Sequence, residues 1–274
     1  MERAKKVLVI DVGGTHVKIL ATGQQERRAM DSGPTLTAAQ MVAGVKKLAE
    51  GWSYDVISIG YPGPVLHNKI ILEPHNLGRG WVAFDFAAAF GKPVRVLNDA
   101  AMQALGSYQG GRMLFHGLGT GLATAMVIDC IVEPMDLGHM LFKKGRSFEE
   151  YVGLRGLKRL GKNRWRKVVA EVVERLRIAL QPEYIVLGGG NAKKLKALPK
   201  DCELGDNANA FKGGFRLWAT DRAGPHVRGV THPGAAPAAA PPAQRQRQSS
   251  PRSARTGARR AASRPRRGSR STRK

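Results

Sequence analysis

The chain has 274 residues, of which 45 are Lys or Arg and 21 are Asp or Glu, so its formal net charge is +24. The charge is unevenly placed, because residues 219–274 hold 14 basic residues and one acid and therefore carry +13 of the total. This division excludes a single folded body with an evenly basic surface. Apolar residues make up 42% of the chain, which is enough for a sizeable core.

The sequence predicts a soluble protein of the reducing cytosol. Near the start only Val7 to Ile10 is apolar, which is shorter than the core of a signal peptide. No stretch approaches the roughly 18 apolar residues of a membrane span. Cys130 and Cys202 fit neither a disulfide framework nor paired zinc ligands. We therefore expect a cytoplasmic location and no membrane partner.

The first hundred residues alternate predicted strands with predicted helices. A helix opens at Thr37, whose hydroxyl and Gln40 form a capping-box pattern ahead of apolar residues at helical spacing. A second helix, 85–90, ends at Gly91. Asn98 and Asp99 stand where the last strand gives way to a helix. The strands are expected at 5–11, 16–22, 26–32, 56–60 and 94–97.

The second half repeats this plan. Strands are predicted at 113–115, 122–128 and 184–187, and the clearest helix runs over 164–180 before Pro182. Strands that alternate with helices and end in glycine turns indicate an α/β fold with mixed sheets. Two similar halves predict an N-terminal lobe over residues 1–100 and a C-terminal lobe over 101–218, with a cleft between them.

Residues 219–274 are expected to form a separate, disordered tail. Ala, Pro, Arg, Gly, Ser and Gln dominate after Trp218. This composition cannot bury enough apolar area to offset a backbone ordering entropy of about 1–2 kcal/mol per residue. Three interpretations stay open: a solvated tail, an arm that binds nucleic acid or another polyanion, or a frameshift product of a GC-rich gene.

Two glycine-rich turns that follow strands are candidate phosphate cradles. In DVGGTHVK, residues 11–18, exposed amides and a hydroxyl can bind phosphate oxygens, and the leading acid can hold Mg²⁺ directly or through water. The second turn is GLGTG, residues 117–121. Either turn could instead be a purely structural hairpin. The candidate phosphate-binding residues are Asp11, Gly13, Gly14, Thr15, Lys18, Gly119, Thr120 and Gly121.

Three further groups of residues suit chemistry on an alcohol. Asp99 could act as a general base, which typically contributes about 10²–10⁴ in rate, although Asn98 and Asp99 also suit a helix N-cap. Asp136 and His139 could hold two sugar hydroxyls or form a structural pair. The run Gly188, Gly189, Gly190 and Asn191, ahead of Lys193, Lys194 and Lys196, fits a nucleotide or polyanion site, or merely a tight turn.

Together and in this order, the motifs resemble the ROK family of sugar kinases, and within it the short polyphosphate or ATP glucokinases, over about residues 5–218. The resemblance rests on DVGGTHVK at 11–18, GYPGPV at 60–65, NLGRGW at 76–81, LNDA at 97–100, GLGTG at 117–121, DLGH at 136–139 and LGGGNA at 187–192. It implies an actin-like ATPase fold of two ribonuclease-H-like lobes.

The resemblance also implies a reaction, namely transfer of a phosphoryl group from ATP or polyphosphate, with Mg²⁺, to the 6-hydroxyl of glucose or a similar hexose. In that reaction Asp99 is the base. The residues implied to bind sugar are Asn76, Asn98, Asp136 and His139, and those implied to line the phosphates are Gly13, Gly14, Thr15, Gly119 and Thr120.

The sequence departs from the family pattern in places. Asp136 stands where the family usually has Glu, and its side chain is one methylene shorter. Many members hold zinc through a cysteine cluster after this motif, and because none stands here we expect no zinc. The repressors of the family carry a DNA-binding segment before the first strand. Only four residues precede Lys5 here, so we expect nucleic-acid binding only through the tail.

Donor, assembly and function are open in part. The +11 of residues 1–218 suits polyphosphate, for which Lys143, Lys144, Arg146 and the basic residues of 158–167 are candidates. A homodimer is compatible with the family. The alternatives are a non-catalytic sensor of sugar or nucleotide on the same fold, or a nucleic-acid binder that acts through its tail.

Overall fold

The computed structural model describes residues 4–219 and 226–227. The chain divides into residues 1–233 and 234–274, and only the first unit contains described residues. The expected disordered tail therefore lies outside the described residues, except for Ala219 and strand β15 (His226–Val227), which pairs in parallel with residues 131–132. None of the helices in the described ranges is long and apolar enough to cross a membrane.

The first sheet has five strands in the order β3-β2-β1-β4-β7. The inner strand β1 pairs in parallel with β4, and β4 pairs in parallel with β7, so the carboxyl ends of these three strands meet at one edge. A small hairpin, β5 (Val65–Leu66) and β6 (Lys69–Ile70), follows β4. The bounds are β1 (Val7–Val12), β2 (His16–Ala21), β3 (Arg28–Asp31), β4 (Val56–Tyr61) and β7 (Val94–Asn98).

The two faces of the first sheet bury different cores, because successive side chains of a strand point to opposite sides. Leu8 and Ile10 pack in a cluster that contains buried residues of α1 (Ala38–Leu48) and α2 (Phe86–Phe90). Val7 and Val9 belong to a cluster on the other face. The predicted capping box at Thr37 is confirmed, with both reciprocal bonds to Gln40 present.

The second sheet has six strands in the order β14-β13-β8-β9-β10-β15, with the hairpin β11–β12 outside it. Its outer face packs on α4 (Phe148–Val152) and α5 (Leu154–Leu180). Helix α5 begins before the predicted residue 164, because two helical segments join across Gly161, whose φ is 71°. The remaining elements are β8 (Arg112–Leu118), β9 (Leu122–Ile128), β10 (Ile131–Met135), β11 (Leu141–Lys143), β12 (Arg146–Ser147), β13 (Tyr184–Gly188), β14 (Cys202–Leu204) and the 3₁₀ helices η1 (Leu137–His139) and η2 (Ala192–Lys194).

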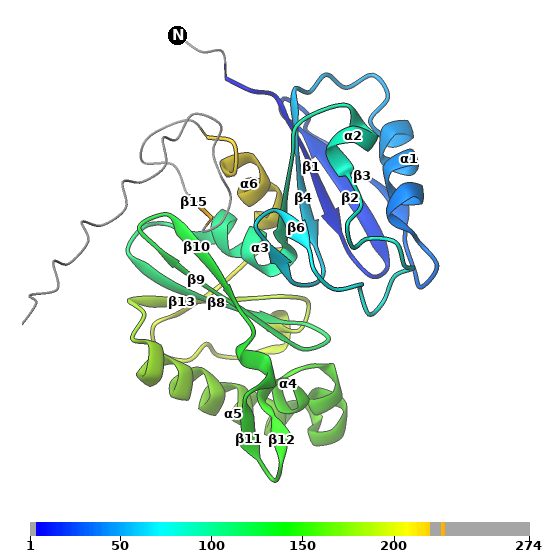
Figure 1. Cartoon of the computed structure of the whole chain (residues 1–274). Coiled ribbons are helices and arrows are strands. Elements are labelled where there is room, and N and C mark those ends of the chain that lie inside the picture. Colours follow the sequence, from blue (N-terminus) through cyan, green and yellow to red (C-terminus); the bar gives the residue numbers. More distant parts are fainter. Residues whose placement is uncertain (1–3, 220–225, 228–274) are drawn as a thin grey trace, which may run out of the picture. The chain divides into compact units, whose positions relative to one another are not determined.

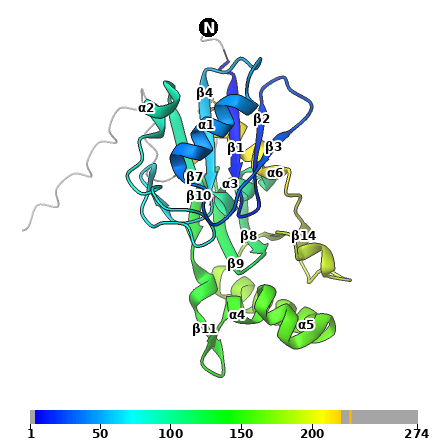
Figure 2. The ribbon, with the colours of Figure 1, turned by 90° about the vertical axis from the view of Figure 1, so that its right-hand side faces the viewer.

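Two helices, α3 (Asp99–Ser107) and α6 (Asn209–Arg216), lie between the two sheets (Figure 1). One apolar cluster joins all of these elements, since it contains Val9 and Leu97 of the first sheet together with Phe115 and Val186 of the second. The helices α1 and α5 lie beyond the sheets on opposite sides of this layer (Figure 2). The element that begins with Asp99 is thus held by both sheets.

Contact between α3 and α6 depends on two glycines. A Cβ on Gly106 would run into the carbonyl of Asn209, and a Cβ on Gly213 would run into the carbonyl of Met102. Both obstacles are backbone atoms of a packed helix, so neither can move away cheaply. Glycine at these positions lets the two helix backbones approach each other closely.

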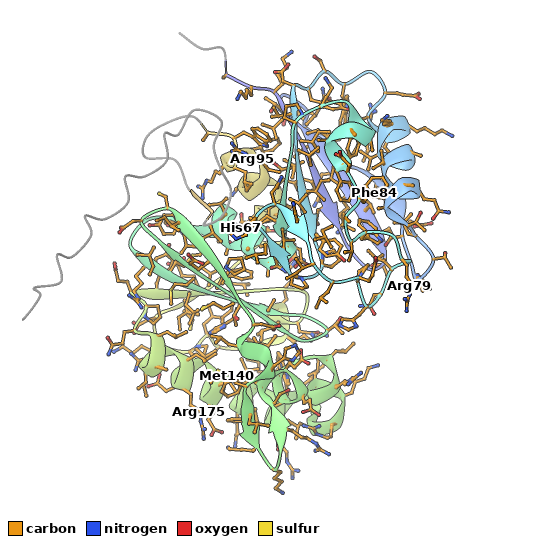
Figure 3. The ribbon with its side chains drawn as sticks, in the orientation of Figure 1. His67, Arg79, Phe84, Arg95, Met140 and Arg175 are labelled. Atoms are coloured by element: carbon orange, nitrogen blue, oxygen red, sulfur yellow. The ribbon has the colours of Figure 1, made fainter. Side chains whose placement is uncertain are left out.

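Just beyond α6, Trp218 docks on the first sheet. Its ring lies under the guanidinium of Arg95, 4.0 Å from carbon to centroid, and its Nε1 donates to Ser58 Oγ at 3.0 Å. Ser58 Oγ in turn donates to the carbonyl of Gly214 at 2.6 Å. Figure 3 shows Arg95 beside α6. These contacts fix the end of α6 to β4 and β7.

We predict that Gly106→Ala and Gly213→Ala each lower the free energy of unfolding by about 3 kcal/mol, because each added methyl overpacks a helix contact. Gly44→Ala in α1 is the matched control. Its added methyl would meet only the flexible end of Met30, and it gains up to about 1 kcal/mol of helix propensity. Urea denaturation compares the three variants, and equal effects would contradict the role given to the α3–α6 contact.

His116 is a second unusual feature of the core. Its side chain on β8 is 1% exposed, and neither ring nitrogen has a hydrogen-bond partner among the described residues. It lies on the same face as Leu114 and Leu118, which pack towards α5. Burial among apolar side chains disfavours the charged ring and lowers the pKa of His116 to about 4.

We predict that His116 weakens the fold in mild acid. The unfolded chain binds a proton below about pH 6.5, whereas the folded ring binds one only near pH 4, so stability falls as the pH drops between these values. The loss attributable to His116 between pH 7 and pH 5 is about 2 kcal/mol. Urea denaturation of the wild type and of His116→Leu at several pH values measures it, and parallel curves would refute it.

Candidate functional site

The carboxyl edge of the first sheet gathers the polar residues that the sequence singled out in the N-terminal half. Asp11 lies near the end of β1, beside Gly60 of β4 and directly opposite Lys18 of β2. Asp99 follows the end of β7 as the first residue of α3. In open α/β sheets the crevice outside this edge is where ligands bind. The strand order therefore brings the two candidate carboxylates together.

Asn98, and not Asp99, caps α3. Asn98 Oδ1 accepts from the amides of Ala100 and Ala101, each at 3.1 Å, while its Nδ2 donates to the carbonyl of Gly63 at 3.1 Å. A helix cap could have explained the presence of either Asn98 or Asp99, and the structure shows that Asn98 forms it. Asp99 is not the N-cap residue, and its carboxylate accepts hydrogen bonds from the amide of Ala100, at 2.7 Å to Oδ1, and from its own backbone amide.

The carboxyl group of Asp99 titrates far from its usual range. Burial raises the pKa of Asp99 to about 7, and the charge of Asp11 raises it further, against hydrogen bonds from the backbone. The pKa of Asp11 is also raised by burial, although Lys18 and Arg27 oppose this. Two carboxyl groups that repel each other at a half-buried edge form a site that attracts protons or cations.

The first glycine turn closes on itself and contacts Asn76. The amide of Gly13 donates to the carbonyl of His16 at 3.0 Å, so this amide is not available to a ligand. Ser32 Oγ donates to the carbonyl of Gly13 at 2.6 Å and fixes the turn. A Cβ on Gly14 would lie 3.4 Å from the Cβ of Asn76, which places the predicted sugar-binding amide against the turn.

The second glycine turn adjoins the third glycine run. The amide of Gly119 donates to the carbonyl of Gly121 at 3.2 Å, and Leu154 at the start of α5 donates to Gly119 and Thr120. Asn191 Nδ2 donates to the carbonyl of Gly119 at 2.8 Å. Residues 117–121 and 188–191 therefore contact each other directly. The order of the motifs in the sequence did not predict this contact.

A third group joins Asp136 and His139 to an acid that the sequence analysis missed. His139 Nε2 lies 3.4 Å from Asp136 Oδ2, and its Nδ1 lies 3.5 Å from Glu149 Oε1. The other oxygen of Glu149 occupies the space that a Cβ on Gly121 would need. Glu149 thus connects the imidazole with the second glycine turn. Figure 3 labels the next residue, Met140, near α4.

No sequence signal pointed to Glu149. It stands between Ser147 and Glu150, which form the capping box of α4, so an acid at this place reads as part of a helix start. Only the packing of α4 against η1 brings its carboxylate to His139. Charge pattern along the chain could not have separated its role from that of Glu150.

The residues fall into two groups, one on each sheet. Across residues 4–219, no hydrogen bond or ion pair joins the group around Asp99 to the group around Gly119 and His139. Helix α3 connects them instead. Its Gln103 Oε1 lies 3.4 Å from the position of a Cβ on Gly188, one helical turn after Asp99. One rigid element therefore reaches both groups.

Comparison with known proteins identifies the family to which the chain is similar. A model of the ROK family matches residues 7–143. A polyphosphate glucokinase of Mycobacterium tuberculosis (strain CDC 1551 / Oshkosh) is 25% identical over 207 residues, which cover 68% of this chain and 77% of the relative.

Solved structures show the same fold. An inorganic polyphosphate/ATP-glucomannokinase from Arthrobacter sp. strain KM has a TM-score of 0.64 and 20% identity, over 77% of this chain and 97% of that chain. A ROK family glucokinase from Streptomyces griseus, in complex with glucose and AMPPNP, has a TM-score of 0.58 and 17% identity, over 76% and 97%. The fold is the expected two-lobed, actin-like ATPase fold.

We predict that Asp99→Asn stabilises the protein at neutral pH. Between about pH 4 and pH 7 the folded carboxyl keeps a proton that the unfolded one has released, so the wild type loses stability as the pH rises through this range. At pH 8 the variant should gain about 1–2 kcal/mol, less than the full pKa shift implies because the side chain is only half-buried. Urea denaturation at pH 5 and pH 8 measures the gain, and an equal effect at both would contradict it.

Proposed function

The chain belongs to the ROK family, and on this basis we propose that it is a sugar kinase that phosphorylates the 6-hydroxyl of glucose or a similar hexose. The observation that carries this proposal is the state of Asp99. Its carboxyl group lies at the carboxyl edge of the first sheet, it is not the N-cap residue of α3, and its pKa is about 7. A general base works best with a pKa near the working pH.

In the proposed reaction Asp99 accepts the proton of the sugar hydroxyl as the oxygen attacks the terminal phosphorus of the donor. Asn76 lies beside the first glycine turn, and Asp136 and His139 lie beside the second, so these side chains are proposed to hold the other hydroxyls. Glu149 would fix His139 in orientation. Asn98, whose amide is already bonded, would act mainly by holding Asp99 in place.

The donor is proposed to be ATP or polyphosphate, bound by the two glycine turns, with Gly188 to Asn191 completing the site. Mg²⁺ fits this edge, because Asp11 and Asp99 repel each other and a cation would relieve the repulsion. Asp11 would hold the ion directly or through water. When bound, the ion would neutralise charge on the donor phosphates.

Polyphosphate is supported by a basic surface on the first half of α5. Four of its exposed cations form no ion pair with any described residue, namely Lys158, Lys162, Arg164 and Lys167. Two other candidates from the sequence are engaged: Lys143 pairs with Glu171 at 2.6 Å, and Arg166 donates to a backbone carbonyl. Free cations along one helix would suit a linear polyanion.

We predict that Asp99→Asn lowers kcat by at least about 100-fold with glucose and either donor, because it removes the base. The matched control is Asp129→Asn, an exposed turn position with a φ of 49° that Asn adopts readily. A coupled assay of glucose 6-phosphate with ATP and with polyphosphate measures both variants. In the wild type, log kcat/KM should rise with pH and level off above about 7, where Asp99 is ionised.

Turnover of Asp99→Asn at the wild-type rate would contradict the proposed base. Calorimetry with glucose tests the alternative that the protein binds sugar without catalysis. Sugar binding by the wild type, with no turnover on either donor, would favour a non-catalytic sensor on the same fold.

A further inference from the structure

The 3₁₀ helix η2 places a lysine beside the second glycine turn. Lys194 Nζ donates to Asn191 Oδ1 at 2.5 Å, and Asn191 Nδ2 donates to the carbonyl of Gly119 at 2.8 Å. The backbone amide of Asn191 donates to the carbonyl of Leu118 at 2.9 Å. Asn191 is only 6% exposed, so it is a fixed support. The ammonium is thus held two hydrogen bonds from the turn.

The surroundings of Lys194 carry positive charge and no compensating acid. The side chain is half-buried, and no carboxylate of a described residue lies within ion-pair distance of its Nζ. The side chain that reaches η2 from α5 is itself cationic, since Arg166 Nε donates to the carbonyl of Lys194 at 2.7 Å. Lys193 and Lys196 are exposed nearby in the sequence.

A partly desolvated ammonium costs free energy unless hydrogen bonds or an anion compensate it. An ammonium has three donors, and Asn191 receives one of them. The ammonium, with its other two N–H groups, is linked through Asn191 to the glycine-rich turn of residues 117–121, which follows β8. Phosphate oxygens are the ligands that fit a cation held in such a place.

We propose that Lys194 binds a phosphate of the donor beyond the one that is transferred, next to the turn of residues 119–121. This inference rests on the proposed kinase function. ATP and polyphosphate both carry such a phosphate, so Lys194 would serve either donor. Because Asn191 holds the ammonium in advance, less side-chain entropy is lost when the donor binds.

Two substitutions separate the charge of Lys194 from its hydrogen bond. Lys194→Gln removes the charge but keeps a group that can donate to Asn191, while Lys194→Arg keeps the charge. The control is Lys193→Gln, which removes one equal charge from the exposed neighbour in the same short helix. The kcat and the KM for donor and for sugar are measured for all three, at low and at physiological ionic strength.

We expect Lys194→Gln to raise the donor KM by about ten- to a hundred-fold, the range of one charge-assisted hydrogen bond. The sugar KM should change by less than about two-fold, and Lys194→Arg should stay within about three-fold of the wild type. Added salt should raise the donor KM of the wild type more than that of Lys194→Gln. Lys193→Gln should resemble the wild type.

Equal donor KM values for Lys194→Gln and Lys193→Gln would overturn the proposal. So would equal losses in Lys194→Gln and Lys194→Arg accompanied by a raised sugar KM, since that pattern reports a structural role. Binding of inorganic tripolyphosphate, measured by calorimetry, gives a readout that needs no turnover. If the wild type is inactive but binds tripolyphosphate more tightly than Lys194→Gln, the kinase proposal fails while the phosphate site stands; equal affinities refute the site.

Discussion

One amide, the side chain of Asn98, underlies the candidate site. It accepts from two amides at the start of α3 and donates to the loop that follows β4. Without it, the first turn of α3 would lose its cap, which is typically worth about 1 kcal/mol, and the link to Gly63. Asp99 would then lose the orientation that sets it near Asp11. The pKa of Asp99 is raised by burial and by the charge of Asp11, and the cap formed by Asn98 holds the carboxyl group in that environment.

The two buried titratable groups act on stability in opposite directions. His116 resists protonation in its apolar surroundings, whereas Asp99 resists ionisation at a half-buried edge beside another acid. The free energy contributed by each therefore changes with the opposite sign over overlapping pH ranges. His116 lies in the core of the second sheet, and its ring makes no hydrogen bond to any described residue. The loss of stability that Asp99 causes at neutral pH is typical of a functional group with a shifted pKa at a binding site.

Local sequence patterns predicted many of the helices, strands and turns of the fold. The capping box at Thr37 and the glycine turns after β1 and β8 are short-range patterns, and short-range patterns can be read from neighbours in the chain. The sequence analysis did not predict the features that depend on packing between distant residues. The α3–α6 contact needs Gly106 against Asn209, and Glu149 reaches His139 only through the placement of α4. The earlier start of α5 depends on a kink at Gly161, which a simple helical period does not predict.

Helix α3 both carries the proposed base and touches the two sheets. Its first residue faces the edge of one sheet, and one turn later Gln103 lies against the glycine run of the other. Because α3 packs against both sheets, a shift of one sheet relative to the other would also move the first residue of this helix. If a ligand bound at the second sheet and displaced that sheet, α3 would transmit the displacement to the carboxylate of Asp99. Binding of one substrate would then also align the carboxylate with the other.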